Sequence, residues 1–309
     1  MRAFVTGASG FVGRHLLAHL EEAGDEVIAA DSHVDVTDAA AIAASLAAAA
    51  PDAVYHLAGL AHVQRSWSEP AEYLRVNAGG TLNVLEAARL CPRPPRVLVV
   101  SSAEVYGAVH ADQLPVGEGE ALRPVSPYAA SKAAAELVGV AAHLGRGTAA
   151  VVARPFNHAG PGQAPGFAIP AFARRIVEAR RRGVDVLAVG NLSARRDIVD
   201  VRDVVRAYRL LVERGEAGEA YNVCTGRSVE IGELVSRLLE LAGARLRLEV
   251  DPDLLRPVDV PELRGDPSRL RRVTGWEPVI PLDETLAAVL EEAESDAEVS
   301  LPGGAGESR

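Results

Sequence analysis

Tyr128 and Lys132 have the spacing with the clearest chemical use in this 309-residue sequence. Four residues apart, they would share one face of a helix. An ammonium near a phenol favours the phenolate and lowers the phenol pKa from its ordinary value of about 10, so that the tyrosine could take or give a proton at neutral pH. Lys132 is the only lysine among the 32 basic residues, and a planar guanidinium does not replace it cleanly. We therefore predict that the pair is catalytic.

A hydroxyl and a carboxylate follow the strand predicted at 97–101. Ser102 supplies a hydroxyl that can orient a carbonyl or alcohol oxygen, and Glu104 supplies a carboxylate two residues later. This carboxylate could act as the base of an elimination, or it could remain in a related site that eliminates no water. Ala103, between them, brings neither an acid nor a hydroxyl. The predicted catalytic residues are Ser102, Glu104, Tyr128 and Lys132.

A glycine-rich segment, Gly7-Ala8-Ser9-Gly10-Phe11-Val12-Gly13, lies between a predicted strand and a predicted helix. Glycines let the backbone approach a pyrophosphate, and the helix N-terminus offers N–H groups and the positive end of its dipole. The strand, the helix and an acid closing the next strand all agree with a dinucleotide site. The predicted contacts from this segment are Gly7, Gly10, Phe11, Val12 and Gly13.

Asp31, at the end of the second predicted strand, is the acid expected to hold the adenosine ribose hydroxyls. Its carboxylate would repel a 2′-phosphate, so the sequence favours NAD over NADP. Asp35 and Val36 could flank the adenine, and the segment after the third predicted strand should pass under the cofactor. The further predicted cofactor contacts are Asp31, Asp35, Val36, Leu57, Ala58 and Gly59, together with Tyr128 and Lys132.

Short apolar strands alternate with helices through the first half of the chain. The strands are predicted at 2–6, 26–30, 53–57, 97–101 and 149–154, and the long helices at 70–90 and 127–144. This alternation is typical of a parallel sheet covered on both faces. The predicted fold class is α/β, a Rossmann doubly wound parallel sheet with a smaller C-terminal α/β substrate lobe.

The chain is predicted to have two domains. A dinucleotide-binding Rossmann domain takes residues 1–157, with segments returning to it at about 195–226 and 258–266. A substrate-binding lobe takes most of 158–294, with helices at 172–182, 228–242 and 283–294 and a strand at 245–250. The acidic and then glycine-rich residues 295–309 are predicted to be disordered.

Composition excludes several classes of protein. The net charge of −10 argues against a nucleic-acid binder, which usually shows a basic face. The chain opens on an apolar strand rather than a signal peptide, and no run of 18 apolar residues could span a membrane, so we expect a cytoplasmic protein. Cys91 and Cys224 match no disulfide framework or zinc spacing, and we predict no metal site.

The glycine pattern, Ser102 and the Tyr128/Lys132 pair resemble the extended short-chain dehydrogenase/reductase family, the NAD-dependent epimerases and dehydratases of nucleotide-diphosphate sugars. The resemblance covers nearly the whole chain. It implies a Rossmann domain, a bound nicotinamide cofactor and a nucleotide-diphosphate sugar as substrate. It also implies a homodimer through two long helices, which by position are those at 70–90 and 127–144.

Segments 154–163, 255–261 and 275–278 resemble GDP-4-keto-6-deoxy-D-mannose reductases. Residues 190–192 and 195–197 resemble a loop that these reductases share with GDP-mannose 4,6-dehydratases. The resemblance implies that Asn157, Arg196 and Arg256 grip the sugar nucleotide diphosphate and that His158 contacts the substrate. Arginine suits this role because its guanidinium pairs with phosphate through charge-assisted, bidentate hydrogen bonds.

Three reactions at the sugar C4 stay open, and in all of them Tyr128 handles the O4 proton. The motifs favour NAD(P)H-dependent reduction of a GDP-4-keto-6-deoxy-hexose. Asp31 instead favours tightly held NAD, which suits the internal redox cycle of a 4,6-dehydratase or a 4-epimerase. Ala103 counts against the dTDP-glucose type of dehydratase, which carries an acid at this place. A non-enzymatic NAD-binding regulator is the most remote alternative, since it could dispense with Tyr128 and Lys132.

Overall fold

The structure is a computed structural model that describes residues 1–30, 34–254 and 260–299. The chain divides into two compact units. Unit 1 comprises Met1–His158, Ala194–Val229 and Val258–Ile280, and unit 2 comprises Ala159–Ser193, Glu230–Pro257 and Pro281–Arg309. Among the described residues, no helix combines the length and the apolar character needed to cross a bilayer. The cytoplasmic location stays a prediction.

A parallel six-stranded sheet forms the centre of unit 1, in the order β10-β5-β4-β3-β1-β2. Its strands are β1 (Arg2–Thr6), β2 (Glu26–Ala30), β3 (Ala53–His56), β4 (Arg96–Val100), β5 (Ala150–Pro155) and β10 (Ala220–Val223). β3, β5 and β10 are buried at every residue, as expected where helices cover both faces. Because the chain leaves β1 in opposite directions to β2 and β3, the carboxyl ends of β1 and β3 form the switch point at which such sheets bind ligands.

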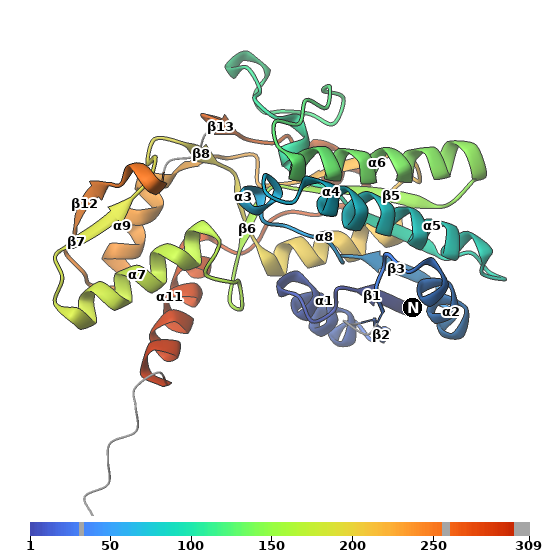
Figure 1. Cartoon of the computed structure of the whole chain (residues 1–309), viewed down its shortest axis with the longest axis horizontal. Helices are drawn as coiled ribbons and strands as arrows, with labels where there is room; N and C mark the ends of the chain where they lie inside the picture. The colour runs from blue at the N-terminus through green and yellow to red at the C-terminus, as the bar shows by residue number, and fades with distance from the viewer. Residues whose placement is uncertain (31–33, 255–259, 300–309) are drawn as a thin grey trace, which may run out of the picture. The chain divides into compact units, whose positions relative to one another are not determined.

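Helices cover both faces of this sheet (Figure 1). α1 (Phe11–Glu22) and α8 (Val201–Arg214) pack together on one face, where Leu16, Leu20 and Leu211 join the core. On the other face lie α2 (Ala39–Ala49), α5 (Gly80–Leu90) and α6 (Pro127–Arg146), with Ile42 and Val84 in a second core cluster. This arrangement confirms the predicted doubly wound α/β fold.

The helix predicted at 70–90 is interrupted by a π-helical turn. The segment consists of α4 (Pro70–Tyr73), the π-helical η1 (Leu74–Gly79) and α5. Such turns carry i→i+5 hydrogen bonds and are frequent at functional sites. The turn carries Asn77, whose buried side chain accepts a hydrogen bond from the N–H of Leu60, the residue after the predicted cofactor segment 57–59.

Shorter elements complete unit 1 and its borders. They are α3 (Val63–Ser66), η2 (Ala103–Tyr106), η3 (Ala111–Gln113), β6 (Asn157–Ala159), β8 (Arg195–Arg196), β9 (Ile198–Asp200), β11 (Val229–Glu230), β13 (Glu262–Leu263) and α10 (Ser268–Thr274). In unit 2, helices α7, α9 and α11 pack on one another, and strands β7 and β12 pair in parallel. Their bounds are α7 (Ala168–Arg182), β7 (Val186–Val189), α9 (Ile231–Leu241), β12 (Arg247–Val250), η4 (Pro252–Leu254) and α11 (Leu282–Val299).

The structure adds helices that the sequence analysis does not predict. α2 is rich in alanine and lacks a clear polar face, but Asp38 caps it by accepting hydrogen bonds from the N–H groups of Ala40 and Ala41. α8 starts in the same way at Asp200. α11 extends further than the helix predicted at 283–294, so the predicted tail begins inside a helix.

Candidate active site

The glycine loop between β1 and α1 packs against the end of β3 at distances that leave no room for side chains. A Cβ on Gly7, whose φ is +69°, would lie 2.8 Å from the Ala58 nitrogen, and a Cβ on Gly13 would lie 2.2 Å from the Gly7 oxygen. α1 begins at Phe11, with Gly10 rather than an acid or a hydroxyl residue at its N-cap. A helix N-terminus beside bare backbone fits the diphosphate of a dinucleotide.

Replacing one of these glycines should remove that fit. We expect Gly13→Ala to weaken NAD(H) binding by at least about tenfold, since about 1.4 kcal/mol of strain corresponds to that factor. Fluorescence titration of the reduced cofactor measures the change. Gly145→Ala is the matched control, because a Cβ there meets nothing within 4 Å and alanine favours a helix. Equal affinities of wild type and Gly13→Ala would contradict the placement of the diphosphate.

The segment after β3 is held by buried polar side chains. The Ala58 N–H donates to Thr6 Oγ1 at 3.2 Å, and that hydroxyl also lies 2.8 Å from His56 Nδ1. Asn77 accepts a hydrogen bond from the Leu60 N–H at 2.8 Å and donates to the Leu60 oxygen at 3.1 Å. Burial lowers the pKa of His56 to about 3, so its ring stays neutral at physiological pH. The predicted cofactor segment is therefore fixed on both sides.

The residues predicted near the adenine lie after β2. The Asp35 carboxylate accepts hydrogen bonds from the Thr37 N–H and hydroxyl at 2.8 and 2.9 Å. The Val36 side chain is buried, and a Cβ on Gly80 would lie 2.8 Å from its Cγ2. Val36 therefore directs its side chain into the core. Asp31, predicted to hold the ribose, lies outside the described residues, and these contacts stay predictions.

α6 brings Tyr128 and Lys132 to the end of β4. The helix begins after Ser126, whose hydroxyl accepts a hydrogen bond from the Ala129 N–H at 3.1 Å, and a proline follows at its first position. The Ser102 hydroxyl lies near the Tyr128 hydroxyl and acts to lower the Tyr128 pKa. Lys132 Nζ donates to the Val100 oxygen at 2.9 Å, and it would lie 3.5 Å from a Cβ on Gly59. Three predicted catalytic residues and the predicted cofactor segment thus meet at one point.

Burial controls the protonation of both groups on α6. It raises the pKa of Tyr128 to about 12, against the lowering effect of the Ser102 hydroxyl, and it lowers the pKa of Lys132 to about 8. The expectation that Lys132 lowers the tyrosine pKa is therefore not met by the protein's own groups. The physical reason is that desolvation dominates and that the ammonium is directed to the Val100 carbonyl. An oxidised nicotinamide, when bound, would add a further positive charge.

Glu104 lies next to the hydroxyl pair. Its N–H donates to Ser102 Oγ at 3.2 Å, and this bond caps the η2 turn. The Glu104 charge contributes to raising the pKa of Tyr128. A role for Glu104 as a base stays a prediction.

The predicted substrate residues Asn157 and His158 lie on β6. Asn157 is exposed. The His158 ring stacks on Phe11 of the glycine loop, with 6.1 Å between the ring centroids and 6° between the planes. Its Nδ1 lies 2.9 Å from the Phe156 oxygen, and a ring N–H there would donate to it. Burial lowers the pKa of His158, which favours the neutral ring. The structure thus brings a predicted substrate residue against a predicted cofactor residue.

The structure describes one of the two predicted phosphate-binding arginines. Arg196 is buried on β8, and its Nη1 donates to the oxygens of Arg195 and Val260 at 2.8 and 2.7 Å. Arg256 lies outside the described residues. Contacts of both arginines with a diphosphate stay predictions.

Asn77 and Ser131 join the site without having been predicted. Asn77 Nδ2 donates to Ser131 Oγ at 2.8 Å, and the Ser131 hydroxyl donates to the backbone carbonyl oxygen of Tyr128 at 2.7 Å. Asn77 thereby connects the cofactor segment to the turn of α6 that carries the catalytic pair. Asn77 is hard to identify as a site residue from the sequence. A polar residue within a predicted helix usually faces solvent, and the hydrophobic periodicity does not reveal the π-helical turn.

The fold and this site define a class of enzymes. The profile of the NAD dependent epimerase/dehydratase family matches residues 3–224, and the chain belongs to this family. The family resemblance predicted from the sequence is thus confirmed.

Among the relatives, the chain is 39% identical over 298 residues to the GDP-6-deoxy-D-mannose reductase of Pseudomonas aeruginosa, covering 95% of this chain and 97% of that protein. It superposes on the structure titled RMD from Pseudomonas aeruginosa complexed with NADPH with a TM-score of 0.88 at 38% identity, covering 95% and 99% of the two chains. It also matches the dTDP-glucose 4,6-dehydratase DesIV from Streptomyces venezuelae with NAD and TYD bound, with a TM-score of 0.84 at 30% identity and coverage of 97% and 98%. Other relatives are dehydratases and epimerases of nucleotide sugars.

Proposed function

We propose that this protein reduces a GDP-4-keto-6-deoxy-hexose at C4 with a reduced nicotinamide cofactor. The observation that carries the choice of reaction is the 39% identity to a GDP-6-deoxy-D-mannose reductase over 95% of the chain. The site is compatible with this reaction, because a phenol, a serine hydroxyl and an ammonium converge beside the cofactor segment.

Each residue of the site has a separate role in the proposed reaction. A bound reduced nicotinamide would supply the hydride for C4. The Ser102 hydroxyl donates a hydrogen bond to O4 and orients the carbonyl, and Tyr128 gives its proton to O4 as negative charge develops there. Lys132, charged below a pKa of about 8, lies one helical turn from the phenol, and its charge together with that of the oxidised nicotinamide would favour the phenolate that remains. The glycine loop and the segment from Leu57 to Gly59 would hold the cofactor.

A 4,6-dehydratase is the second candidate, and Glu104 is the residue that favours it. Its carboxylate is near enough to raise the pKa of Tyr128, and an elimination needs a base of this kind. Ala103 brings no acid for a departing hydroxyl, which favours the reductase.

A substrate panel separates the candidates. We expect GDP-4-keto-6-deoxymannose to consume NADH or NADPH stoichiometrically, as followed by nicotinamide absorbance. GDP-mannose and UDP-glucose should give no product by mass spectrometry or chromatography. Loss of water from GDP-mannose would establish the dehydratase instead, and conversion of UDP-glucose to its C4 epimer would establish the epimerase.

The form of the cofactor is a separate prediction. Asp31 should repel a 2′-phosphate, so we expect kcat/KM for NADH to exceed that for NADPH by about tenfold or more. Asp31→Ser should reduce or reverse this ratio without changing kcat with NADH. A wild-type preference for NADPH, the cofactor in the Pseudomonas aeruginosa structure, would contradict the role of Asp31.

We also propose a homodimer through the segments 70–90 and 127–144. Five of the twelve large apolar side chains that are exposed among the described residues lie on η1, α5 and α6, namely Leu74, Leu82, Leu90, Leu137 and Leu144. Exposed apolar faces of this kind mark interfaces, and two-fold dimers are the commonest assemblies.

Charge on this face should therefore break the dimer. We expect the wild type to sediment at twice the chain mass of 32.4 kDa and Leu137→Glu/Leu144→Glu to sediment as a monomer. Val279→Glu is the control, because Val279 is equally exposed but lies outside both segments. A monomeric wild type, or a dimeric double variant, would contradict this proposal.

A further inference from the structure

Three residues on one stripe of α6 contact three consecutive residues at the end of β4. The Tyr128 hydroxyl lies near that of Ser102, Lys132 Nζ donates to the Val100 oxygen at 2.9 Å, and the Ser101 hydroxyl donates to Glu136 Oε2 at 2.9 Å. Positions 128, 132 and 136 are successive i, i+4 neighbours and share one helix face. The third contact involves no predicted catalytic residue, yet it lies on the same face of α6 as the first two.

Glu136 is held from its other side by Arg154 of β5. Arg154 Nε donates to both Glu136 carboxylate oxygens, at 3.1 and 3.0 Å, and Nη2 also donates to Oε1. The two side chains are only 6% and 4% exposed. The carboxylate is thus fixed by the end of one strand and by the guanidinium of the next.

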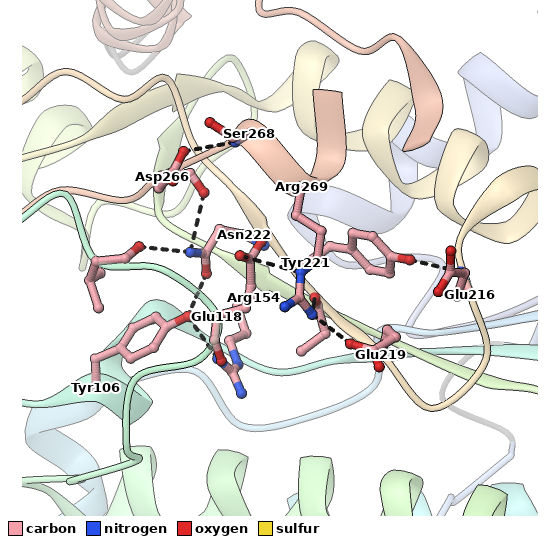
Figure 2. Close-up of polar contacts among 12 residues, drawn as sticks. Tyr106, Glu118, Arg154, Glu216, Glu219, Tyr221, Asn222, Asp266, Ser268 and Arg269 are labelled. Carbon is pink, nitrogen blue, oxygen red and sulfur yellow. Dashed lines mark hydrogen bonds and ion pairs between the residues drawn. The ribbon is translucent and has the colours of Figure 1, made fainter. Parts of the chain in front are cut away.

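Arg154 is itself anchored in a wider buried network (Figure 2). Its Nη1 donates to the Tyr106 hydroxyl at 2.7 Å and to the backbone carbonyl oxygen of Glu118 at 3.1 Å. The Tyr106 hydroxyl donates to Asn222 Oδ1 at 2.7 Å, so the network reaches β10. Tyr106 ends the η2 turn that begins after Ser102. Hydrogen bonds through the guanidinium therefore join α6 to β5, to β10 and to the turn that follows the catalytic serine.

Stability alone does not account for this buried pair. Removing two charges from water is expensive, and replacing a buried ion pair by apolar residues of similar volume is often neutral or stabilising. The charged groups fix the relative orientation of the two side chains, since a bidentate arginine–carboxylate pair has a fixed geometry. Catalysis is sensitive to such geometry, because a displacement of about 1 Å can cost about 10²-fold in rate.

We propose that Ser101, Glu136 and Arg154 are positioning residues that fix α6 on the end of β4 and thereby hold Tyr128 at Ser102. The proposal rests on the proposed reduction for its readout. The three residues touch neither substrate nor cofactor in this account, and they act through the placement of the phenol.

Two variants test the proposal. Ser101→Ala removes the contact between β4 and Glu136 and leaves the ion pair whole. Glu136→Leu/Arg154→Met replaces the ion pair by apolar side chains, so that neither charge is left buried alone. For both we expect kcat to fall at least about tenfold with KM for sugar nucleotide and cofactor unchanged, because binding groups stay in place and the proton transfer is misaligned.

Ile42→Val is the matched control, since it removes one methylene group from the core on α2, a helix that takes no part in the contacts between α6 and the end of β4. It should lower Tm without changing kcat. The proposal is overturned if Ser101→Ala keeps kcat within twofold of the wild type, or if its kcat loss comes with an equal rise in KM. Should the double variant not fold, Ser101→Ala decides alone. A wild type that turns over none of the substrates in the panel would overturn the proposed function instead, and the two failures are therefore distinguishable.

Discussion

Tyr128→Phe should lose about 10²- to 10⁴-fold in kcat, the range that one positioned proton donor contributes. The phenyl ring would keep its edge-to-face packing on Tyr73, where the ring centroids are 6.4 Å apart. We therefore expect the affinity for reduced cofactor, measured by fluorescence titration, to stay within threefold of the wild-type value.

Tyr73→Phe is the matched control for that variant. It removes a hydroxyl that donates to the His62 oxygen at 2.6 Å and has no part in proton transfer, so kcat should change by less than about threefold, the effect of a lost neutral hydrogen bond of under about 1 kcal/mol. If Tyr128→Phe kept more than a tenth of wild-type turnover, another group would have to supply the proton. If it also lost cofactor binding, the residue would be structural.

Lys132→Met should have the second largest effect, a loss of about 10²-fold or more in kcat/KM at pH 7, because it removes an ammonium that lies one helical turn from the phenol and would act with the oxidised nicotinamide to favour the phenolate. Wild-type kcat/KM should also decline as pH rises above about 8, where the free enzyme's Lys132 loses its charge. Tyr128, with a pKa of about 12, and His56, with a pKa of about 3, do not titrate in this range. A wild-type profile that is flat from pH 6 to 10 would contradict the role of the lysine.

The same pKa of Lys132 has a consequence for stability. Between about pH 8 and 10.5 the unfolded chain holds the lysine proton and the folded chain does not, so the free energy of unfolding rises with pH over this window. Below pH 8 both states are charged, and the folded state carries the full cost of a buried ammonium. Lys132→Met should be at least as stable as the wild type at pH 7 and should lack this rise.

The parts of the site that follow short periodic patterns were predictable from the sequence. The glycine loop lies between an apolar strand and a helix, and the tyrosine and lysine occupy one helix face, so both their chemistry and their placement were visible. The lone lysine was the most specific signal, because arginine is used almost everywhere else in this chain.

The parts that depend on contacts between distant segments were not predictable. Arg154 appeared in the sequence only as part of a segment resembling a substrate loop, whereas its side chain binds Glu136, 18 residues away. Asn77 owes its place to a π-helical turn that periodicity does not show. The protonation of Tyr128 depends on burial, which the sequence alone did not reveal. The same is true of Val36, whose side chain turns into the core.

Transfer of deuterium from the cofactor is the measurement that tests the proposed reduction most directly. The protein would be incubated with GDP-4-keto-6-deoxymannose and reduced cofactor carrying deuterium at the transferred position. We predict one deuterium at C4 of the product, seen by NMR, with one equivalent of cofactor oxidised per product. An unlabelled product, or one formed with no net cofactor oxidation, would contradict reduction at C4 and indicate an internal redox cycle.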